Sequence, residues 1–160
     1  MNTHTLNEIL PVFMTRVNQM VWCNAATIDT QGRPRSRILH PLWEGPVAWI
    51  TADPTSLKTR HLATHPYMSL AYASDVAKPA YADCHAAWVD DPDIRQHVWN
   101  LCQETPPPMG FDPEPIYGAI DPPVAGRSRF GVLRLEPYRI VLTQWPEPLW
   151  QWSAERSGTA

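Results

Sequence analysis

The segment TSLKTRHLATHP, residues 55–66, carries two cations where a helix would begin. Ser56 is a favoured N-cap residue and Pro66 is a natural stop, so the segment predicts a short helix. Lys58 and Arg60 then fall in its first turn, although a helix N-terminus already carries partial positive charge. Each exposed cation there costs about 0.3–1 kcal/mol, and a bound anion would offset that cost.

Other donors are expected beside this helix start. A strand is expected to end at Thr51, shortly before Ser56. Helix N-termini hold anions, and Arg binds phosphate bidentately. The hydroxyls and cations of this region would therefore form a phosphate clamp from Arg37, Thr51, Ser56, Lys58 and Arg60. The alternative is a surface ion pair of Lys58 with Asp53 or Glu44.

An arginine-rich run, GRPRSRILH, precedes that strand. Arg33, Arg35 and Arg37 are two residues apart, so on a strand they share one face. Like charges on one face repel each other unless water solvates them or they share an anion. Solvation at the edge of a hairpin explains Arg33 and Arg35 as well as an anion does. Arg37 is followed directly by the apolar residues Ile38 and Leu39, so solvation of its side chain is less favoured and a shared anion is more favoured.

Motifs for catalysis and metal binding are weak. His61 and His65 have the i, i+4 spacing of metal ligands, but the glutamate of H-E-x-x-H is absent and no third ligand follows. We expect solvated or packing histidines and no metal. Cys84 and His85 are neighbours on an expected strand and point to opposite faces, so they do not form a nucleophile–base pair. We therefore name no catalytic side chain.

The elements that position these residues follow from the apolar pattern. Helical spacing predicts a helix over residues 6–20, weakened or split by Pro11, and a later helix that begins at Asp91-Pro92. The last ten residues are expected to be a frayed tail, and the Pro-rich segment 105–129 a loop or lid with one short helical turn. Strands are expected over residues 21–29, 34–43, 47–51, 67–73, 80–91, 129–137 and 138–145.

Short strands at regular spacing with few helices predict one domain over residues 1–160. Its class is mainly β with peripheral helices, an antiparallel barrel with the helices outside. The sequence has no βαβ repeat and no GxGxxG motif, which argues against a Rossmann fold.

Composition narrows the class of protein. Hydrophobic residues make up 44% of the chain, charged residues 18%, and 18 residues are Pro, which is typical of a compact chain with rigid loops. The net charge of −3 does not indicate a nucleic-acid partner. The absence of a leader pattern and of a long apolar run predicts a cytoplasmic protein without a membrane partner. Cys23, Cys84 and Cys102 are expected to be reduced, mostly buried thiols.

The run RPRSRILH…VAWITADPTSLKTRHLATHPYMSLAY resembles the flavin-binding core of the pyridoxamine 5′-phosphate oxidase-like family. The similarity covers about residues 20–90 and the closing strands 130–145, and it implies an FMN-binding split β-barrel. In the family, an R-[IV]-[LV] strand lays its backbone along the flavin ring. A strand that ends in Thr and a Ser-x-Lys helix start grip the phosphate. The matching residues here are Arg37-Ile38-Leu39, Ile50-Thr51 and Ser56-Leu57-Lys58.

The resemblance implies FMN as the cofactor. Trp43 is expected in the substrate pocket, and His40 is expected to hydrogen-bond an edge of the ring. The full set of expected cofactor-binding residues is Arg35, Arg37, Ile38, Leu39, His40, Ile50, Thr51, Ser56, Lys58, Thr59 and Arg60.

Two departures from the family pattern bear on the activity. Leu57 stands where the vitamin oxidase has a second basic residue, and its substrate-phosphate set has only Gln144-Trp145 as a counterpart. Oxidation of pyridoxamine phosphate is therefore not expected. The Lys-Thr-Arg-x-Leu form of residues 58–62 is closer to actinobacterial members that use the deazaflavin F420, whose polyanionic tail Arg35 and Arg60 would bind. F420 is thus the alternative cofactor.

The resemblance implies an oxidoreductase that transfers a hydride between FMN or F420 and a small planar molecule. It also implies a homodimer with the cofactor site at the interface. One alternative is a non-catalytic split-barrel module that binds or carries a flavin or haem. Another is a barrel that has lost its cofactor, which the missing second basic residue would explain.

Overall fold

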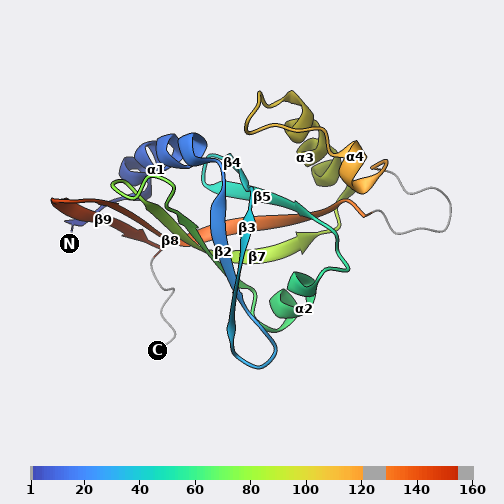
Figure 1. The fold of residues 1–160 in the computed structure, drawn as a ribbon, viewed down its shortest axis with the longest axis horizontal. Coiled ribbons are helices and arrows are strands. Elements are labelled where there is room, and N and C mark those ends of the chain that lie inside the picture. Colours follow the sequence, from blue (N-terminus) through green and yellow to red (C-terminus); the bar gives the residue numbers. More distant parts are fainter. Residues whose placement is uncertain (1, 121–128, 155–160) are drawn as a thin grey trace.

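The computed structural model describes residues 2–120 and 129–154, which form one nine-stranded sheet with helices around it (Figure 1). The helices are α1 (Leu6–Met20), α2 (Leu57–Thr64), α3 (Pro92–Glu104) and α4 (Glu114–Tyr117). The strands are β1 (Asn2–Thr3), β2 (Cys23–Ile28), β3 (Pro34–Leu39), β4 (Leu42–Glu44), β5 (Val47–Ala52), β6 (Tyr67–Tyr72), β7 (Ala80–Val89), β8 (Gly131–Gln144) and β9 (Glu147–Ser153).

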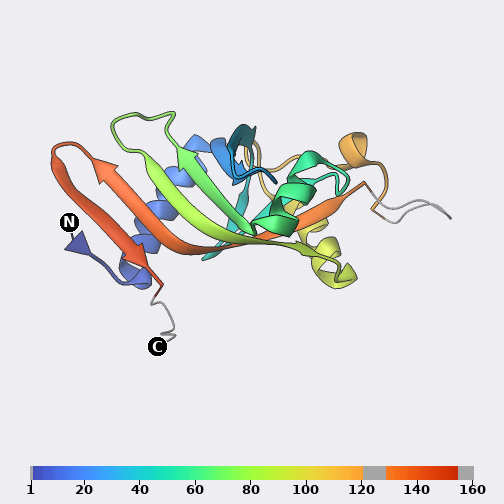
Figure 2. The ribbon, with the colours of Figure 1, turned by 90° about the horizontal axis from the view of Figure 1, so that it is seen from below.

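The strand order is β1-β9-β8-β7-β6-β2-β3, and β5 joins this path through β8. One half of β8 pairs with β5 and the other half with β9, while β7 pairs along nearly all of it. Figure 2 shows the long strands β7 and β8 curving through the length of the molecule. Among the described residues, β3 pairs with β2 alone, so it is an edge strand whose outer backbone groups have no ladder partner.

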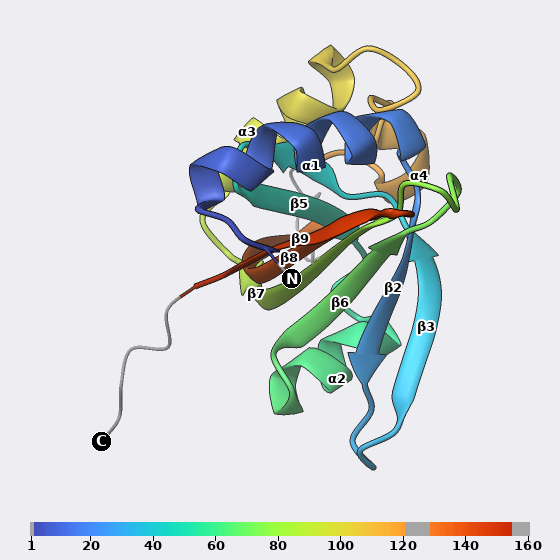
Figure 3. The same cartoon turned by 90° about the vertical axis from the view of Figure 1, so that its left-hand side faces the viewer.

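The main core lies between the curved sheet and α1. The helix begins at a capping box of Thr5 and Glu8, and it buries Ile9, Phe13 and Val17 at helical spacing. Phe13 packs edge-on against the ring of Trp43, with 4.8 Å between ring centroids. Burial of such side chains stabilises the fold by roughly 1.5–3 kcal/mol each, which holds α1 across the strands (Figure 3).

A second apolar cluster lies under α3. Asp91 caps this helix by accepting hydrogen bonds from the backbone N–H groups of Asp93 and Ile94. The cluster consists of Leu42, Trp49, Val98, Trp99, Cys102, Phe130 and Val132. It packs α3 against one face of β4, β5 and β8, while the opposite face of these strands contributes residues such as Trp43, Ile50 and Leu133 to the main core.

Several expectations from the sequence are confirmed and four are wrong. The helix over residues 6–20 has the expected bounds, but Pro11 does not split it. Residues 34–43 form two strands, β3 and β4, separated at His40-Pro41. The expected tail contains the end of β9, which is tied to β8 and to β1. The three cysteines are buried, as expected.

The fourth error concerns the last two expected strands, which are the single strand β8. Proline at position 137 lacks the N–H that a ladder requires, which is why the sequence suggested a break there. The register of β7 shifts between Asp83 and Cys84, and Pro137 lies opposite Cys84. Asp83 pairs with Arg139 and Cys84 pairs with Pro137, so the extra residue is Tyr138 and the bulge lies in β8 itself, next to the proline. β8 continues past the bulge instead of ending there.

No helix in the described parts of the chain is long and apolar enough to cross a membrane.

Candidate functional site

The β2–β3 hairpin places its three arginines in two different environments. Asp29 accepts hydrogen bonds from the backbone N–H groups of Gln31 and Arg33, which shapes the turn. The same carboxylate pairs with Nε of Arg33 at 3.1 Å and with Nε of Arg35 at 3.0 Å. These donors hold the pKa of Asp29 well below its usual range, the backbone N–H of Arg33 most of all. Arg33 and Arg35 thus already share a carboxylate.

Arg37 is held differently. Its Nη1 donates to Oγ1 of Thr27 at 2.9 Å, and that oxygen lies 3.0 Å from Nδ1 of His61. Thr27 is only 1% exposed and His61 9%, so both are buried between β2 and α2. Because Oγ1 accepts from Arg37, the Thr27 hydroxyl proton can be donated to Nδ1 of His61. We call this hydrogen-bonded chain the Arg37–Thr27–His61 relay.

Lys58 lies half-buried in the first turn of α2, and Ser56 is its N-cap residue. The Lys58 ammonium donates to Oγ of Ser56 at 3.3 Å. Burial and the nearby positive charge of Arg37 lower the pKa of Lys58, and Asp53 partly opposes this. Lys58 has no ion pair with a carboxylate among the described residues.

The expected alternative for Lys58 was a surface ion pair with Asp53 or Glu44. Asp53 instead pairs with Arg129 at 3.3 Å. Glu44 accepts from His97 at 2.9 Å and from the indole N–H of Trp49. Neither carboxylate therefore forms an ion pair with Lys58.

Arg37 and Lys58 form a cationic pair from two elements far apart in sequence. Burial lowers the pKa of the Arg37 guanidinium, and no carboxylate among the described residues pairs with it. Two unit charges in a partly desolvated environment repel by a few kcal/mol when they are close. An anion between them would replace that repulsion by two charge-assisted hydrogen bonds. The donor chemistry of this pair thus fits a phosphate group.

The end of β3 and the residue that follows it lie at the unpaired edge of the sheet, beside Arg37. Ile38 is 64% exposed, and Leu39 packs against the main core. The ring of His40 lies between Trp22 and Phe111, at centroid distances of 4.9 and 5.8 Å. Its Nε2 is buried without a hydrogen-bond partner among the described residues, and burial lowers its pKa. A neutral imidazole with an unused nitrogen therefore lies next to the edge strand.

Other expected site residues have their own partners or lie in the core or at the surface. Thr51 hydrogen-bonds Tyr117 at 3.1 Å between the two hydroxyls, so the end of β5 contacts the helical turn α4. Ile50 is 1% exposed and points into the main core. Thr59 donates to the backbone oxygen of Pro54, and Arg60 is exposed.

Trp43, expected in the substrate pocket, lies in the main core instead. It is 9% exposed and donates its indole N–H to the hydroxyl of Tyr72 at 2.8 Å. The physical reason is strand alternation: Trp49 faces the α3 cluster, whereas Trp43 on β4 turns toward Phe13.

Thr27 and His61 were missed as site residues. Alternation on β2 offered a signal, because Thr27 shares a face with buried Cys23 and Ala25 and is polar there. His61 lies one helical turn after Lys58, on the same face of α2. In the β2–β3 register Thr27 lies opposite Arg35 and diagonal to Arg37, so only the folded hairpin shows that it bonds Arg37.

Comparisons with known proteins agree on the architecture. No family model and no curated protein match the sequence. A Nostoc punctiforme protein described as pyridoxamine 5′-phosphate oxidase-related and FMN binding is 17% identical, with a TM-score of 0.63, over 91% of this chain and 87% of that chain. A Clostridium acetobutylicum protein of the pyridoxinephosphate oxidase family, related to general stress protein 26, is 12% identical, with a TM-score of 0.69, over 91% and 94%.

A heme binding protein from Mycobacterium smegmatis is also similar, at 14% identity and a TM-score of 0.67. That match covers 88% of this chain and 56% of the other. At these identities the likeness establishes architecture. The chain therefore has the split β-barrel fold of pyridoxamine 5′-phosphate oxidase-like, FMN-binding proteins, as the sequence predicted.

Proposed function

We propose that this protein binds FMN through its phosphate group and acts as a flavin-dependent oxidoreductase. The observation that carries the proposal is the cationic pair of Arg37 and Lys58, which is half-buried and has no carboxylate partner among the described residues. Natural proteins rarely leave two cations together in a partly desolvated place without an anion. The fold shared with FMN-binding proteins supports a flavin phosphate as that anion.

The residues around the pair have distinct roles in this proposal. Thr27 orients the Arg37 guanidinium, while Ser56 and the N-terminus of α2 add donors beside Lys58. The open edge of β3 offers the backbone groups of Ile38 and Leu39 to a planar ring. FMN supplies the hydride chemistry when bound, and the protein supplies position and electrostatics. The substrate would be a small planar molecule.

We also propose a homodimer with the site at its interface. The edge strand β3 exposes Ile38 at 64%, and Trp22 beside it is 57% exposed. Exposed apolar side chains next to an unpaired strand edge favour an interface. Light scattering at micromolar protein should give the dimer mass, and a monomer mass would contradict a shared site.

One observation favours a second candidate, a haem-binding module. The buried Nε2 of His40 has no hydrogen-bond partner among the described residues, and burial lowers the pKa of this imidazole, which favours the neutral form that ligates iron. Aromatic Trp22 and Phe111 flank it. Titration with haemin, followed by the Soret band, should show ligation in the wild type and lose it in His40→Ala if this candidate is correct.

The deciding experiment is equilibrium titration of the apo protein with FMN, riboflavin and F420, followed by fluorescence. Tight FMN binding with much weaker riboflavin binding supports the phosphate site. A preference for F420 would replace FMN by the deazaflavin and leave the anion site intact. Binding of none of the three would favour a barrel that has lost its cofactor.

A matched pair of variants tests the role of Lys58. Lys58→Ala should weaken FMN binding by about 1–3 kcal/mol, the usual contribution of a charge-assisted hydrogen bond. Lys78→Ala, which removes the other lysine at an exposed position, should leave the affinity unchanged. Equal affinities for FMN in the two variants would contradict the proposal.

A further inference from the structure

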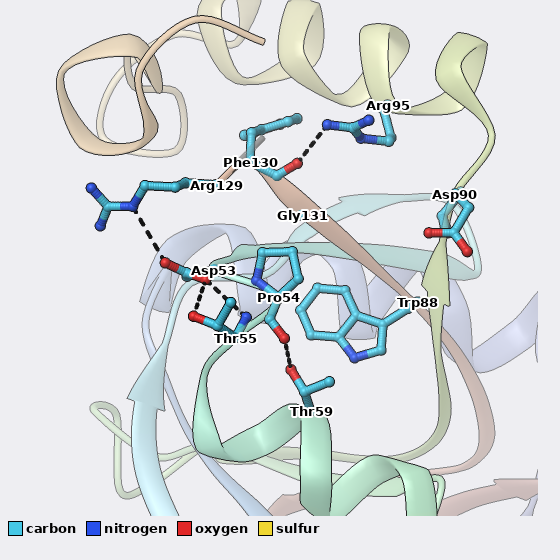
Figure 4. A pocket seen from close by; sticks show the side chains of 11 residues that line it. Asp53, Pro54, Thr55, Thr59, Trp88, Asp90, Arg95, Arg129, Phe130 and Gly131 are labelled. Atoms are coloured by element: carbon cyan, nitrogen blue, oxygen red, sulfur yellow. Dashed lines mark hydrogen bonds and ion pairs between the residues drawn. The ribbon is translucent and has the colours of Figure 1, made fainter. Parts of the chain in front are cut away.

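A cavity of about 630 Å³ lies beside the N-terminus of α2, next to the loop residues Asp53, Pro54 and Thr55 (Figure 4). It is bounded by the loop that precedes α2, the end of β7, the start of α3 and the start of β8. Its volume falls within the range of roughly 300–1,000 Å³ that is usual for small-molecule sites. The residues that carry the following inference are Pro54, Trp88, Arg95, Arg129 and Phe130.

The cavity has a planar apolar wall where the ring of Trp88 lies beside Pro54 (Figure 4). Phe130 borders the opposite side with its backbone, because its ring is fully buried in the cluster under α3. Gly131 allows the close approach of Trp88 and Pro54, because a Cβ there would lie 2.7 Å from Trp88 and 2.6 Å from Pro54. Such a wall favours a flat aromatic ring, which stacks on indole and covers apolar surface.

Two guanidinium groups lie on the side that carries Phe130. Arg95 donates through Nη2 to the backbone oxygen of Phe130 at 2.9 Å, and Arg129 uses Nε for Asp53. Their other N–H groups have no hydrogen-bond partner among the described residues and can donate to a carboxylate in the forked geometry that Arg prefers. Arg129 is shared with Asp53 through that ion pair, whereas Arg95 has no carboxylate partner among the described residues. Asp90 is exposed, so water screens its charge.

We propose that this cavity binds a planar aromatic carboxylate. The ring would lie against Trp88 and Pro54, and the carboxylate would face Arg95 and Arg129. The proposal does not depend on the flavin phosphate site. Thr55 and Thr59 line the cavity, whereas Ser56 and Lys58 belong to the phosphate site. The N-terminal turn of α2 therefore separates two binding sites.

The test uses 2-naphthoate as the probe and its neutral amide, 2-naphthamide, as the comparison, with affinities from calorimetry on the full-length apo protein. The wild type should bind 2-naphthoate at least about tenfold more tightly than 2-naphthamide, since a charge-assisted hydrogen bond is lost in the amide. Arg95→Gln should remove that preference. Arg134→Gln, at an exposed residue of β8 outside the cavity, should retain it.

Two further measurements keep the outcome decisive. Arg129→Gln repeats the test at a side chain that is 68% exposed, in case loss of the Arg95 bond to Phe130 destabilises the fold. Saturating FMN should leave the affinity for 2-naphthoate unchanged, and Arg95→Gln should leave FMN binding unchanged. Equal binding of acid and amide, no binding of either, or displacement of 2-naphthoate by FMN would each overturn a separate carboxylate site. If FMN did not bind, the proposed cofactor would be rejected, but the proposed carboxylate site would not.

Discussion

Replacing Thr27 by Val tests whether the buried relay behind Arg37 serves phosphate binding. The substitution conserves shape but removes the hydroxyl that accepts from Arg37 at 2.9 Å and lies 3.0 Å from His61. Arg37 keeps its charge and its place on β3, while its guanidinium loses the partner that fixes its orientation. FMN should therefore bind less tightly, because part of one charge-assisted hydrogen bond is lost.

The magnitude follows from the two broken bonds. Loss of the orientation of Arg37 should weaken FMN binding by about 1–1.5 kcal/mol, or roughly five- to tenfold. Riboflavin has no phosphate, so its affinity should not change. The free energy of unfolding should fall by about 1–2 kcal/mol, because Nδ1 of buried His61 is left without a partner.

The assay is fluorescence titration of wild type, Thr27→Val and Thr27→Ser with FMN and with riboflavin, beside urea unfolding of each protein. Thr27→Ser retains the hydroxyl and should retain most of the preference for FMN over riboflavin. If Thr27→Val weakened FMN and riboflavin equally, the effect would be general to the fold, and the reasoning about Arg37 would be refuted. An unchanged affinity of Thr27→Val for FMN would also refute the reasoning about Arg37.

Three other predictions concern groups outside the relay. Burial lowers the pKa of His40, so below the ordinary histidine pKa of about 6.5 the unfolded chain binds this proton more readily than the folded chain does. The free energy of unfolding should therefore fall as the pH is lowered from about 7 to about 5. Urea unfolding at each pH should show a smaller fall in His40→Phe. The pKa of Asp29 is lowered, chiefly by a backbone N–H of its own turn, so the ionised Asp29 stabilises the fold above about pH 4 and this contribution is lost in acid. Asp29→Ala should therefore lower the thermal midpoint at pH 7, and the difference from wild type should shrink toward pH 2. Tyr117→Phe should lower the free energy of unfolding by about 1 kcal/mol through loss of the bond to Thr51, whereas Tyr138→Phe at an exposed position should have no effect, and equal values for the two variants would contradict this assignment.

Local patterns of the sequence were sufficient for most elements. The periodicity of residues 6–20 predicted α1 to the residue, because an apolar stripe at helical spacing is a local signal. The Asp-Pro start of α3 and the Ser56 start of α2 were equally local. The errors fell where a distant strand decided the outcome. β7 pairs with β8 on both sides of the bulge at Tyr138, next to Pro137, and β1, from the other end of the sequence, pairs with β9.

The same division applies to the cationic pair. Residue types alone pointed to Arg37 and Lys58, because cations at a helix start and before an apolar run need an explanation. The sequence could not say whether a carboxylate already neutralised them. Only the fold assigned Asp53 to Arg129, and Asp29 to Arg33 and Arg35.

The sequence by itself determined the positions of the helices and most strands, the barrel class, and the excess of cations near α2. The tertiary structure decided which cations have no carboxylate partner among the described residues, which polar residue supports Arg37 from the core, and that Trp43 packs inside the barrel. It also created the cavity beside Trp88, whose walls come from four separate segments. Elements follow from periodicity along the chain, whereas charge pairing and cavities depend on distances between segments that only the folded sheet brings together.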